Sequence, residues 1–304
     1  MSNYFSKLFL ALKMANYQRL RKRREPQRAA YRQWVAENDT IDADKLRALE
    51  ASCEQLTRRP RISVIMPVYN APLQWLDEAI ESVRQQVYQD WELCIADDCS
   101  SDPRVRPFLQ KKAAEDARIK LTLRPVNGHI SAASNSAIEQ ATGEFLAFMD
   151  QDDLIPRHAL LEVALCINHH PQAQFIYTDE DKIDEHSQRE SPTRKTGWSP
   201  GLLTQLNKVS HLVVYRQELV ASVGGLRVGF EGAQDHDLAL RCSEQLDATQ
   251  IIHIPKILYH WRSHSNSTAQ VRSSKPYAVL ARRKAIQEHL VRQAQCPGQS
   301  RPAS

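Results

Sequence analysis

From residue 61 onward, short apolar runs alternate with amphipathic segments, and this alternation limits the possible folds more than any other feature of the sequence. Polar turns follow the apolar runs, and the segments between them carry apolar residues at helical spacing. We expect strands over residues 62–66, 91–96, 119–123, 144–149 and 174–178, and helices over 73–86, 105–114, 130–141 and 157–168. This alternation predicts an α/β fold with a mostly parallel central sheet and helices on both faces.

Polar side chains collect where the predicted strands end. These strand ends lie in residues 67–70, 97–102, 150–153 and 179–182. Ligands of open parallel sheets bind in the crevice at the carboxyl ends of the strands, so we expect a ligand site there. Some of these acids have a second explanation, because Asp102 and Asp153 stand where they could cap the helices that follow.

Three carboxylates, Asp150, Asp152 and Asp153, directly follow the apolar run over residues 145–149. Carboxylates that lie close together in a buried setting are costly unless a cation neutralises them. The sequence has no CxxC pair and no His cluster at zinc spacing. Oxygen ligands favour Mg²⁺ or Mn²⁺, and such an ion usually keeps coordination positions open for the phosphates of a substrate.

Several other phosphate-handling and hydrolytic designs are excluded by their motifs. The chain contains no GxxxxGK[ST] loop, no GxGxxG fingerprint, no GxSxG elbow and no HExxH helix. A cation-assisted reaction of a phosphate-bearing substrate therefore remains the leading interpretation of the acidic turn.

Four segments together resemble the inverting family 2 glycosyltransferases of the GT-A fold. These segments are RISVIMPVYN, WELCIADDCSSD, VNGHISAASNSAIEQATGEFLAFMDQDD and FEGAQDHDLALR, and the resemblance spans about residues 61–262. Within the family, YTDEDKID and LYHWRSHSNSTA are similar to bacterial enzymes of O-antigen, lipopolysaccharide and capsule assembly. The resemblance implies transfer of a sugar from a nucleotide sugar with inversion at the anomeric carbon.

The resemblance also implies which residues surround the nucleotide. Pro67, Tyr69 and Asn70 would line its pocket, and Asp98 would accept a hydrogen bond from the base. The sugar diphosphate would lie beside three further residues, namely Asn127, Gly128 and Asn135. Many members of the family have Arg before this last Asn, whereas Ser134 stands here.

The acidic motifs receive roles in the same way. Asp150 and Asp152 match the metal-binding DxD motif, which Asp153 extends, and Asp235 matches the general base. Many members have Glu before the base, whereas this chain has Gln234; the nearby Asp237 is the alternative base. Four further residues are possible substrate contacts, namely Asp179, Asp181, Arg241 and His260. These acids also have a purely structural interpretation. Asp235 could be an acid that stabilises a helix N-terminus, and residues 179–182 could form a solvated loop.

Two other functions remain open at this point. A nucleotidyltransferase also uses acids on an α/β sheet to hold Mg²⁺, but PVYNAP lacks the Gly-rich basic loop such an enzyme needs. A non-catalytic nucleotide-sugar binding or scaffold protein would be favoured by a broken DxD or a lost base, and both motifs are intact. The donor is expected to be UDP- or dTDP-linked, and the enzyme a hexosyl- or rhamnosyltransferase.

The first 60 residues form a basic, mostly helical N-terminal arm before the expected glycosyltransferase domain over residues 61–292. The arm holds thirteen Lys and Arg against seven Asp and Glu. A basic cluster over residues 19–24 follows an apolar stripe of Tyr4, Phe5, Leu8, Phe9 and Leu12. This pattern suits an anionic membrane surface, or a helix that packs on its own domain. No nucleic-acid reader fold accompanies the basic cluster, so nucleic acid is not an expected partner.

The six cysteines suggest neither a disulfide framework nor a zinc site, which fits the cytoplasm. No secretory signal and no transmembrane helix are expected, so we predict a cytoplasmic protein, peripheral on the inner membrane. A saccharide, expected to be linked to a lipid at that membrane face, would then be the acceptor. Residues 293–304 are expected to form a disordered tail.

Overall fold

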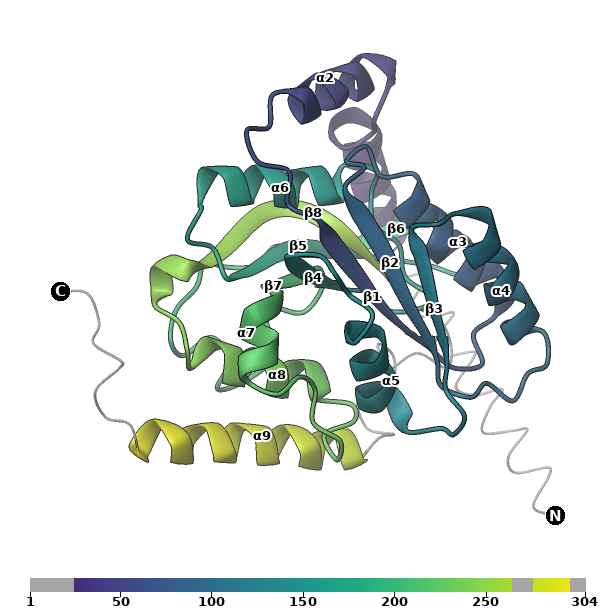
Figure 1. The fold of residues 1–304 in the computed structure, drawn as a ribbon. Coiled ribbons are helices and arrows are strands. Elements are labelled where there is room, and N and C mark those ends of the chain that lie inside the picture. Colours follow the sequence, from purple (N-terminus) through teal and green to yellow (C-terminus); the bar gives the residue numbers. More distant parts are fainter. Residues whose placement is uncertain (1–24, 264–275, 296–304) are drawn as a thin grey trace.

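The structure, a computed structural model, describes residues 25–263 and 276–295. Its centre is one eight-stranded sheet in the order β3-β2-β1-β4-β7-β5-β6, with β8 paired to β5 (Figure 1). The strands are β1 Ile62–Val68, β2 Trp91–Asp97, β3 Ile119–Leu123, β4 Phe145–Phe148, β5 Phe175–Ile183, β6 Arg189–Thr193, β7 Val213–Arg216 and β8 Ile251–Arg262. The labelled helices are α2 Ala43–Glu54, α3 Leu73–Arg84, α4 Val105–Glu115, α5 His129–Ile138, α6 Ala159–His169, α7 Gln217–Ser222, α8 Gln234–Ser243 and α9 Pro276–Gln295.

Parallel pairing dominates the first half of the sheet. Strand β1 pairs in parallel with β2 and β4, and β2 pairs in parallel with β3. Strand β7 is antiparallel to both β4 and β5, whereas β8 returns parallel to β5. The expectation of a mostly parallel central sheet with helices on both faces is thus confirmed.

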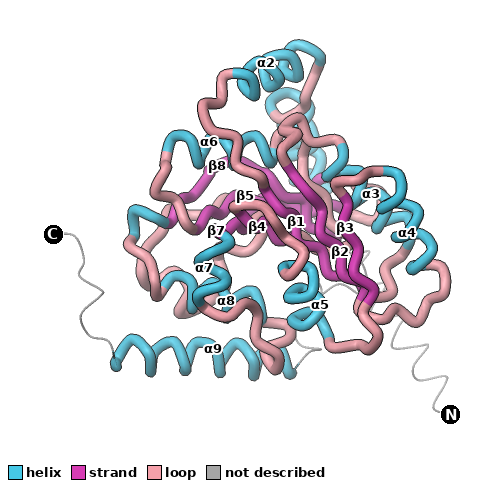
Figure 2. Tube along the Cα trace, in the orientation of Figure 1, coloured by secondary structure: helices cyan, strands magenta, loops and turns pink. Residues whose placement is uncertain are grey.

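Two hydrophobic cores lie on the two faces of the sheet, because successive strand residues point to opposite sides. In β1, Val64 and Met66 belong to the core that α3, α4 and α6 cover, whereas Ile65 belongs to the core under α5, α7 and α8. Figure 2 shows these helices flanking the strands. The carboxyl ends of β1, β2 and β4 therefore open at one edge, between two packed layers.

Several predicted element boundaries were wrong. Residues 179–182 lie within β5 and are not the loop after it. Pro67 does not end the first strand but lies within β1. Helix α9 continues to Gln295, so the first part of the expected tail is helical, and the rest of that tail lies outside the described residues.

The described part of the N-terminal arm contacts the sheet domain closely. A helix over residues 25–38 contributes Arg28, which is buried and pairs with Asp184 (3.2 Å) and Glu190. From the same helix, the Tyr31 hydroxyl donates to Asp181 at 2.8 Å. The expected apolar stripe and the basic cluster over 19–24 lie outside the described residues.

Candidate active site

The acidic turn after β4 is held against β8 by one of its own carboxylates. Asp153 is buried, and it accepts hydrogen bonds from the Tyr259 hydroxyl (2.6 Å) and from the Arg262 amide (2.7 Å). The Tyr259 hydroxyl in turn accepts from the Asp150 amide at 3.1 Å. These bonds commit Asp153 to shaping the turn, so the expectation that it binds metal is not supported by its position.

Asp150 and Asp152 are half-buried in the same turn. The pKa of Asp150 is raised to about 6: burial raises it most, His211 opposes the rise, and the negative charges of Asp152 and Asp235 add to it. The field of Asp235 thus reaches Asp150, although 85 residues of sequence separate them. The structure therefore brings the DxD motif and the expected base to one region.

These carboxylates fit a cation that is shared with a phosphate better than one enclosed by protein. In the described ranges, no group of three or more His, Cys, Asp or Glu side chains gathers as a metal site. The pKa of Asp150 is raised, and the charge of Asp152 contributes to the rise, so a divalent ion between these carboxylates would stabilise both. Mg²⁺ and Mn²⁺ are commonly held by one or two carboxylates plus substrate phosphates. Asp150 and Asp152 fit that arrangement.

Asp235 and Asp237 lie in the first turn of α8 but have different surroundings. Asp235 is half-buried, and its Oδ2 accepts from Asn207 Nδ2 at 2.8 Å. Asp237 is fully buried and accepts from Arg227 Nε (3.0 Å) and Arg241 Nε (2.9 Å). Asp237 therefore cannot reach an acceptor without breaking two ion pairs, which leaves Asp235 as the candidate base.

Arg241 also belongs to this internal network. Besides Asp237, its guanidinium donates to the carbonyls of Val223 and Gly225, each at 2.7 Å. All its nitrogen atoms are thus engaged with the protein. These bonds hold α8 to the turn after α7, so the position of Arg241 does not support the expected substrate contact.

Asp98 directly follows β2, and its side chain is buried and held by hydrogen bonds to one carboxylate oxygen. Its Oδ1 accepts from Arg124 Nε (2.8 Å) and from the Gly128 amide (2.9 Å). The Asn127 side chain donates to the Asp98 carbonyl at 3.0 Å. Arg124, which sequence reasoning missed, fixes this carboxylate, and Asn127 and Gly128 shape the loop beside it.

The loops after β1 and β4 are tied together by Gln151. Its Oε1 accepts from the Tyr69 amide at 2.8 Å, and its Nε2 donates to the Tyr69 carbonyl at 3.2 Å. The Tyr69 ring is left 46% exposed, so its face is available to a stacking base. Pro67 lies half-buried in β1, just before this loop. Gln151 lies between the acids of the DxD motif, but its bonds to Tyr69 could not be predicted from local sequence.

Asn70 ties the loop after β1 to the loop after β2. Its backbone φ is +48°, in the left-handed region that Asn tolerates. The Asn70 amide donates to Ser100 Oγ, and Asn70 Oδ1 accepts from the Asp102 amide, both at 2.9 Å. Asn70 therefore builds the wall of the predicted nucleotide pocket through bonds within the protein.

Asn135 is engaged elsewhere. Its Nδ2 donates to the Leu226 carbonyl (2.8 Å), and its Oδ1 accepts from the Leu226 amide (2.9 Å). Gly225 adjoins this contact with φ of +68°, and a Cβ there would come within 2.8 Å of Asn135 Oδ1. The structure thus places Asn135 at the junction of α5 with the segment before α8, in a packing role.

Three further candidates lie in buried pairs of the β5–β8 region. Asp179 accepts from the Lys195 amide and bonds to His253 Nε2, both at 2.8 Å. Asp181 is fully buried and bonds to His260 Nδ1 at 2.6 Å. The His260 amide donates to the Leu154 carbonyl at 2.8 Å, next to the acidic turn, while its ring is held by Asp181. The alternative of a solvated loop is wrong, and all three side chains stabilise the sheet.

His211 is a residue of the site that carried no sequence signal. Its ring stacks on Tyr259 at 4.8 Å between centroids, and its φ of +55° lies in the left-handed region. The buried Lys195 donates to the carbonyls of Ser210 and His211. His211 lowers the pKa of Asp150, so the imidazole lies near that carboxylate. No helical or strand periodicity marked residues 198–211, so neither His211 nor Asn207 was predicted.

Comparison with known proteins assigns the family. Residues 63–224 match Glycosyl transferase family 2, and the chain belongs to that family. It is 49% identical over 249 residues to protein y4gI of Sinorhizobium fredii, a match that covers 81% of this chain and 27% of that protein. It is 37% identical over 278 residues to the O-antigen biosynthesis protein RfbC of Myxococcus xanthus, covering 91% of this chain and 21% of that protein. The chain thus spans about a quarter of the length of these relatives.

Solved structures show the same GT-A fold. TarS of S. aureus, in complex with UDP-GlcNAc, superposes with a TM-score of 0.60 at 19% identity, covering 77% of this chain and 73% of that one. The mannosyltransferase PcManGT of Pyrobaculum calidifontis, in complex with GDP-Man and Mn²⁺, gives 0.54 at 17% identity, covering 84% and 83%. Among the described helices, none has both the length and the apolar character that crossing a bilayer requires.

Proposed function

We propose that this chain is an inverting glycosyltransferase that moves a sugar from a nucleoside diphosphate sugar to a saccharide acceptor. The observation that carries the proposal is that Asp235 lies close enough to the Asp150–Asp152 turn for its charge to raise the pKa of Asp150. Family membership supports the same reaction class. The relatives that bind UDP-GlcNAc or GDP-Man support a nucleotide sugar as the donor, here UDP- or dTDP-linked.

In the proposed reaction, Asp235 takes the proton from an acceptor hydroxyl as that oxygen attacks the anomeric carbon. The new C–O bond forms as the bond to the diphosphate breaks, and attack from the opposite face inverts the carbon. Asn207 holds Asp235 Oδ2, which leaves Oδ1 to receive the proton. Asp150 and Asp152 would hold Mn²⁺ or Mg²⁺, which when bound supplies positive charge to the departing diphosphate.

Asp98 and Tyr69 would hold the nucleoside. Asp98 Oδ1 is already engaged by Arg124, so Oδ2 is the oxygen that would accept from the base. The exposed Tyr69 ring would stack on that base. Neither contact identifies the sugar, so a donor screen must include both hexosyl and rhamnosyl nucleotides.

The test is a donor screen with purified protein, Mn²⁺ and a panel of UDP- and dTDP-sugars, with and without saccharide acceptors. We expect one donor to release nucleoside diphosphate only when acceptor is present, and NMR of the product to show an inverted anomeric centre. Tight donor binding without release under every acceptor would instead support the non-catalytic binding protein. Retention of configuration would contradict the role of Asp235 as base.

We propose that the reaction serves cell-surface polysaccharide synthesis, with a lipid-linked acceptor at the cytoplasmic face of the inner membrane. The likeness to RfbC supports the pathway class. The basic cluster over residues 19–24 supports contact between the N-terminal arm and anionic lipid. Deleting residues 1–24 should weaken sedimentation with such vesicles, and unchanged sedimentation would remove this role of the arm.

A further inference from the structure

Helix α9 exposes an apolar stripe that no described part of the chain covers. The helix packs through Ala281, Ala285 and His289, which are buried. The opposite side exposes four large side chains, and the exposed fractions are 51% for Tyr277, 63% for Leu280, 54% for Leu290 and 49% for Val291. Isolated exposed apolar residues are ordinary, but a row of them along one helix marks an interaction surface.

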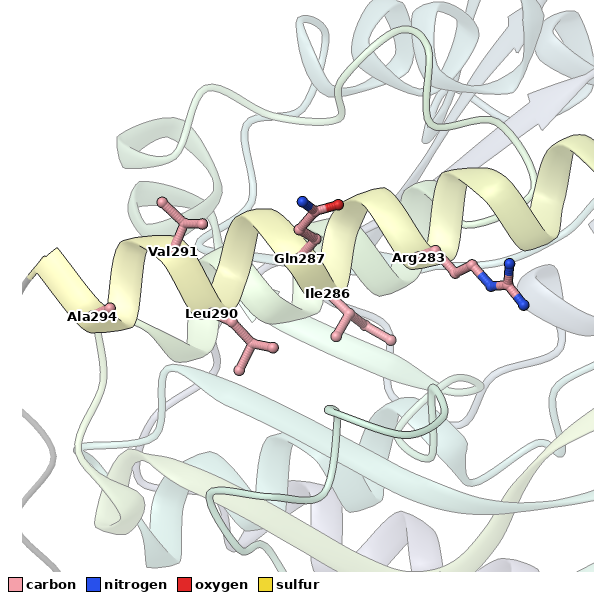
Figure 3. Close-up of a pocket in the computed structure, with 6 residues that line it drawn as sticks. All are labelled: Arg283, Ile286, Gln287, Leu290, Val291 and Ala294. Carbon is pink, nitrogen blue, oxygen red and sulfur yellow. The ribbon is translucent and has the colours of Figure 1, made fainter.

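The same stripe is cationic. Arg283 and Lys284 are exposed between the two apolar ends of the stripe. The single acid of α9, Glu288, pairs with Arg227 at 2.6 Å and with Arg292 at 3.7 Å, beside the stripe. A groove of about 430 Å³ lies along this helix, lined by Arg283, Ile286 and Leu290 among others. Figure 3 shows Ile286 and Leu290 pointing to the same side of α9. Apolar and cationic side chains without acids are typical of helices that lie on anionic bilayers.

The stripe lies beside the candidate base. Helix α9 packs along α8, whose first turn carries Asp235 (Figure 1). Gly232 precedes α8, and a Cβ there would meet Ala278 Cβ at 2.7 Å and the Tyr277 ring at 3.1 Å. The beginning of α9 therefore packs directly on the segment that leads into the base. A surface bound by α9 would lie close to the place where an acceptor hydroxyl must arrive.

We propose that the outward face of α9, defined by Tyr277, Leu280, Arg283, Lys284, Leu290 and Val291, binds an anionic lipid bilayer. Its contact is separate from the one proposed for the N-terminal arm. The outward face of α9 would also present a lipid-linked acceptor to Asp235. This second role rests on the proposed function, whereas lipid binding itself does not. A second copy of the chain fits less well, because a two-fold contact across this stripe would bring Arg283 and Lys284 of both copies together without an acid.

The test is flotation of the full-length protein with vesicles of phosphatidylcholine alone or with 30 mol% phosphatidylglycerol. We expect binding only to the anionic vesicles. The double variant L280S/L290S should lower the partition coefficient at least tenfold, because two half-exposed leucines lose their apolar burial. L280M/L290M keeps the apolar character and should bind like the unmodified protein. R283Q/K284Q should weaken binding about tenfold, whereas R106Q/K111Q, with the same charge change on α4, should not.

Binding of L280S/L290S at the unmodified level would overturn the proposal, since the arm alone would then account for it. Light scattering that shows a dimer split by L280S/L290S would overturn it in favour of a second copy. Circular dichroism checks that each variant is folded. Activity on a water-soluble acceptor separates this proposal from the proposed function. L280S/L290S should keep that activity. A protein that is inactive on every acceptor would contradict the proposed function but would leave the lipid-binding proposal standing.

Discussion

Replacing either acid at the start of α8 by Asn should produce opposite defects. Asp237→Asn removes the charge that two arginines share at a fully buried site. Arg241 is itself nearly buried and would be left facing an amide, with its charge uncompensated. Asp235→Asn changes a half-buried group that, within residues 25–263 and 276–295, has one side-chain hydrogen bond, from Asn207.

The expected magnitudes follow from these surroundings. Removing one partner of a buried ion pair lowers the free energy of unfolding by about 3–5 kcal/mol, and we expect a decrease of that size for Asp237→Asn. In a domain of this size, such a loss lowers the melting temperature by about 10 °C. Asp235→Asn should change the free energy of unfolding by about 1 kcal/mol or less. The same variant should lower kcat by about 100-fold or more, because a positioned base is lost.

Urea unfolding followed by tryptophan fluorescence gives the stabilities, and nucleotide release with the best donor gives the rates. Asp237→Asn should retain much of its activity per folded molecule at low temperature. The reasoning would be refuted if Asp237→Asn were as stable as the unmodified protein yet inactive, and Asp235→Asn were active. That result would make Asp237 the base and the arginine pairs dispensable.

Three further predictions concern single residues. Burial raises the pKa of Glu92, but hydrogen bonds, among them that from Lys120, lower it to about 2 from an ordinary 4.5. Glu92→Gln should therefore lower the free energy of unfolding by about 3 kcal/mol above pH 4.5. Urea titrations should show this difference vanishing as the pH falls toward 2. Asn207→Ala should lower kcat about tenfold with little change in KM, because Asp235 loses the donor that positions it. An unchanged kcat would count against this positioning. Asp98→Asn should weaken nucleoside diphosphate binding about tenfold by calorimetry, and equal affinity would exclude its contact with the base.

The sequence predicted those parts of the fold that local periodicity encodes. β3 has the expected bounds because an apolar run with flanking turns suffices to define a strand. β5 was cut short because Asp179 and Asp181 look like loop residues, although both are buried in the strand. Their partners, among them His253 and His260, lie more than 70 residues further along the chain, so no local pattern could reveal them.

The candidate site was predictable to the extent that its motifs lie at strand and helix ends. The motifs predicted Asp150, Asp152 and Asp235 as candidates in this way, but Asp153 was grouped with them because its bond to Tyr259 is not visible in the sequence. Likewise, His211 is placed by stacking on Tyr259 of β8, which lies far from it in the chain. Contacts between distant segments decide which polar residues face the ligand and which hold the fold.

The most direct test of the account is anomalous diffraction at the manganese edge from crystals grown with Mn²⁺ and the nucleoside diphosphate that binds most tightly. We predict one strong manganese peak between the carboxylates of Asp150 and Asp152 and the diphosphate, with Asp235 facing the same space. Manganese and nucleotide bound elsewhere, with both carboxylates of that turn free of ligand, would contradict the account.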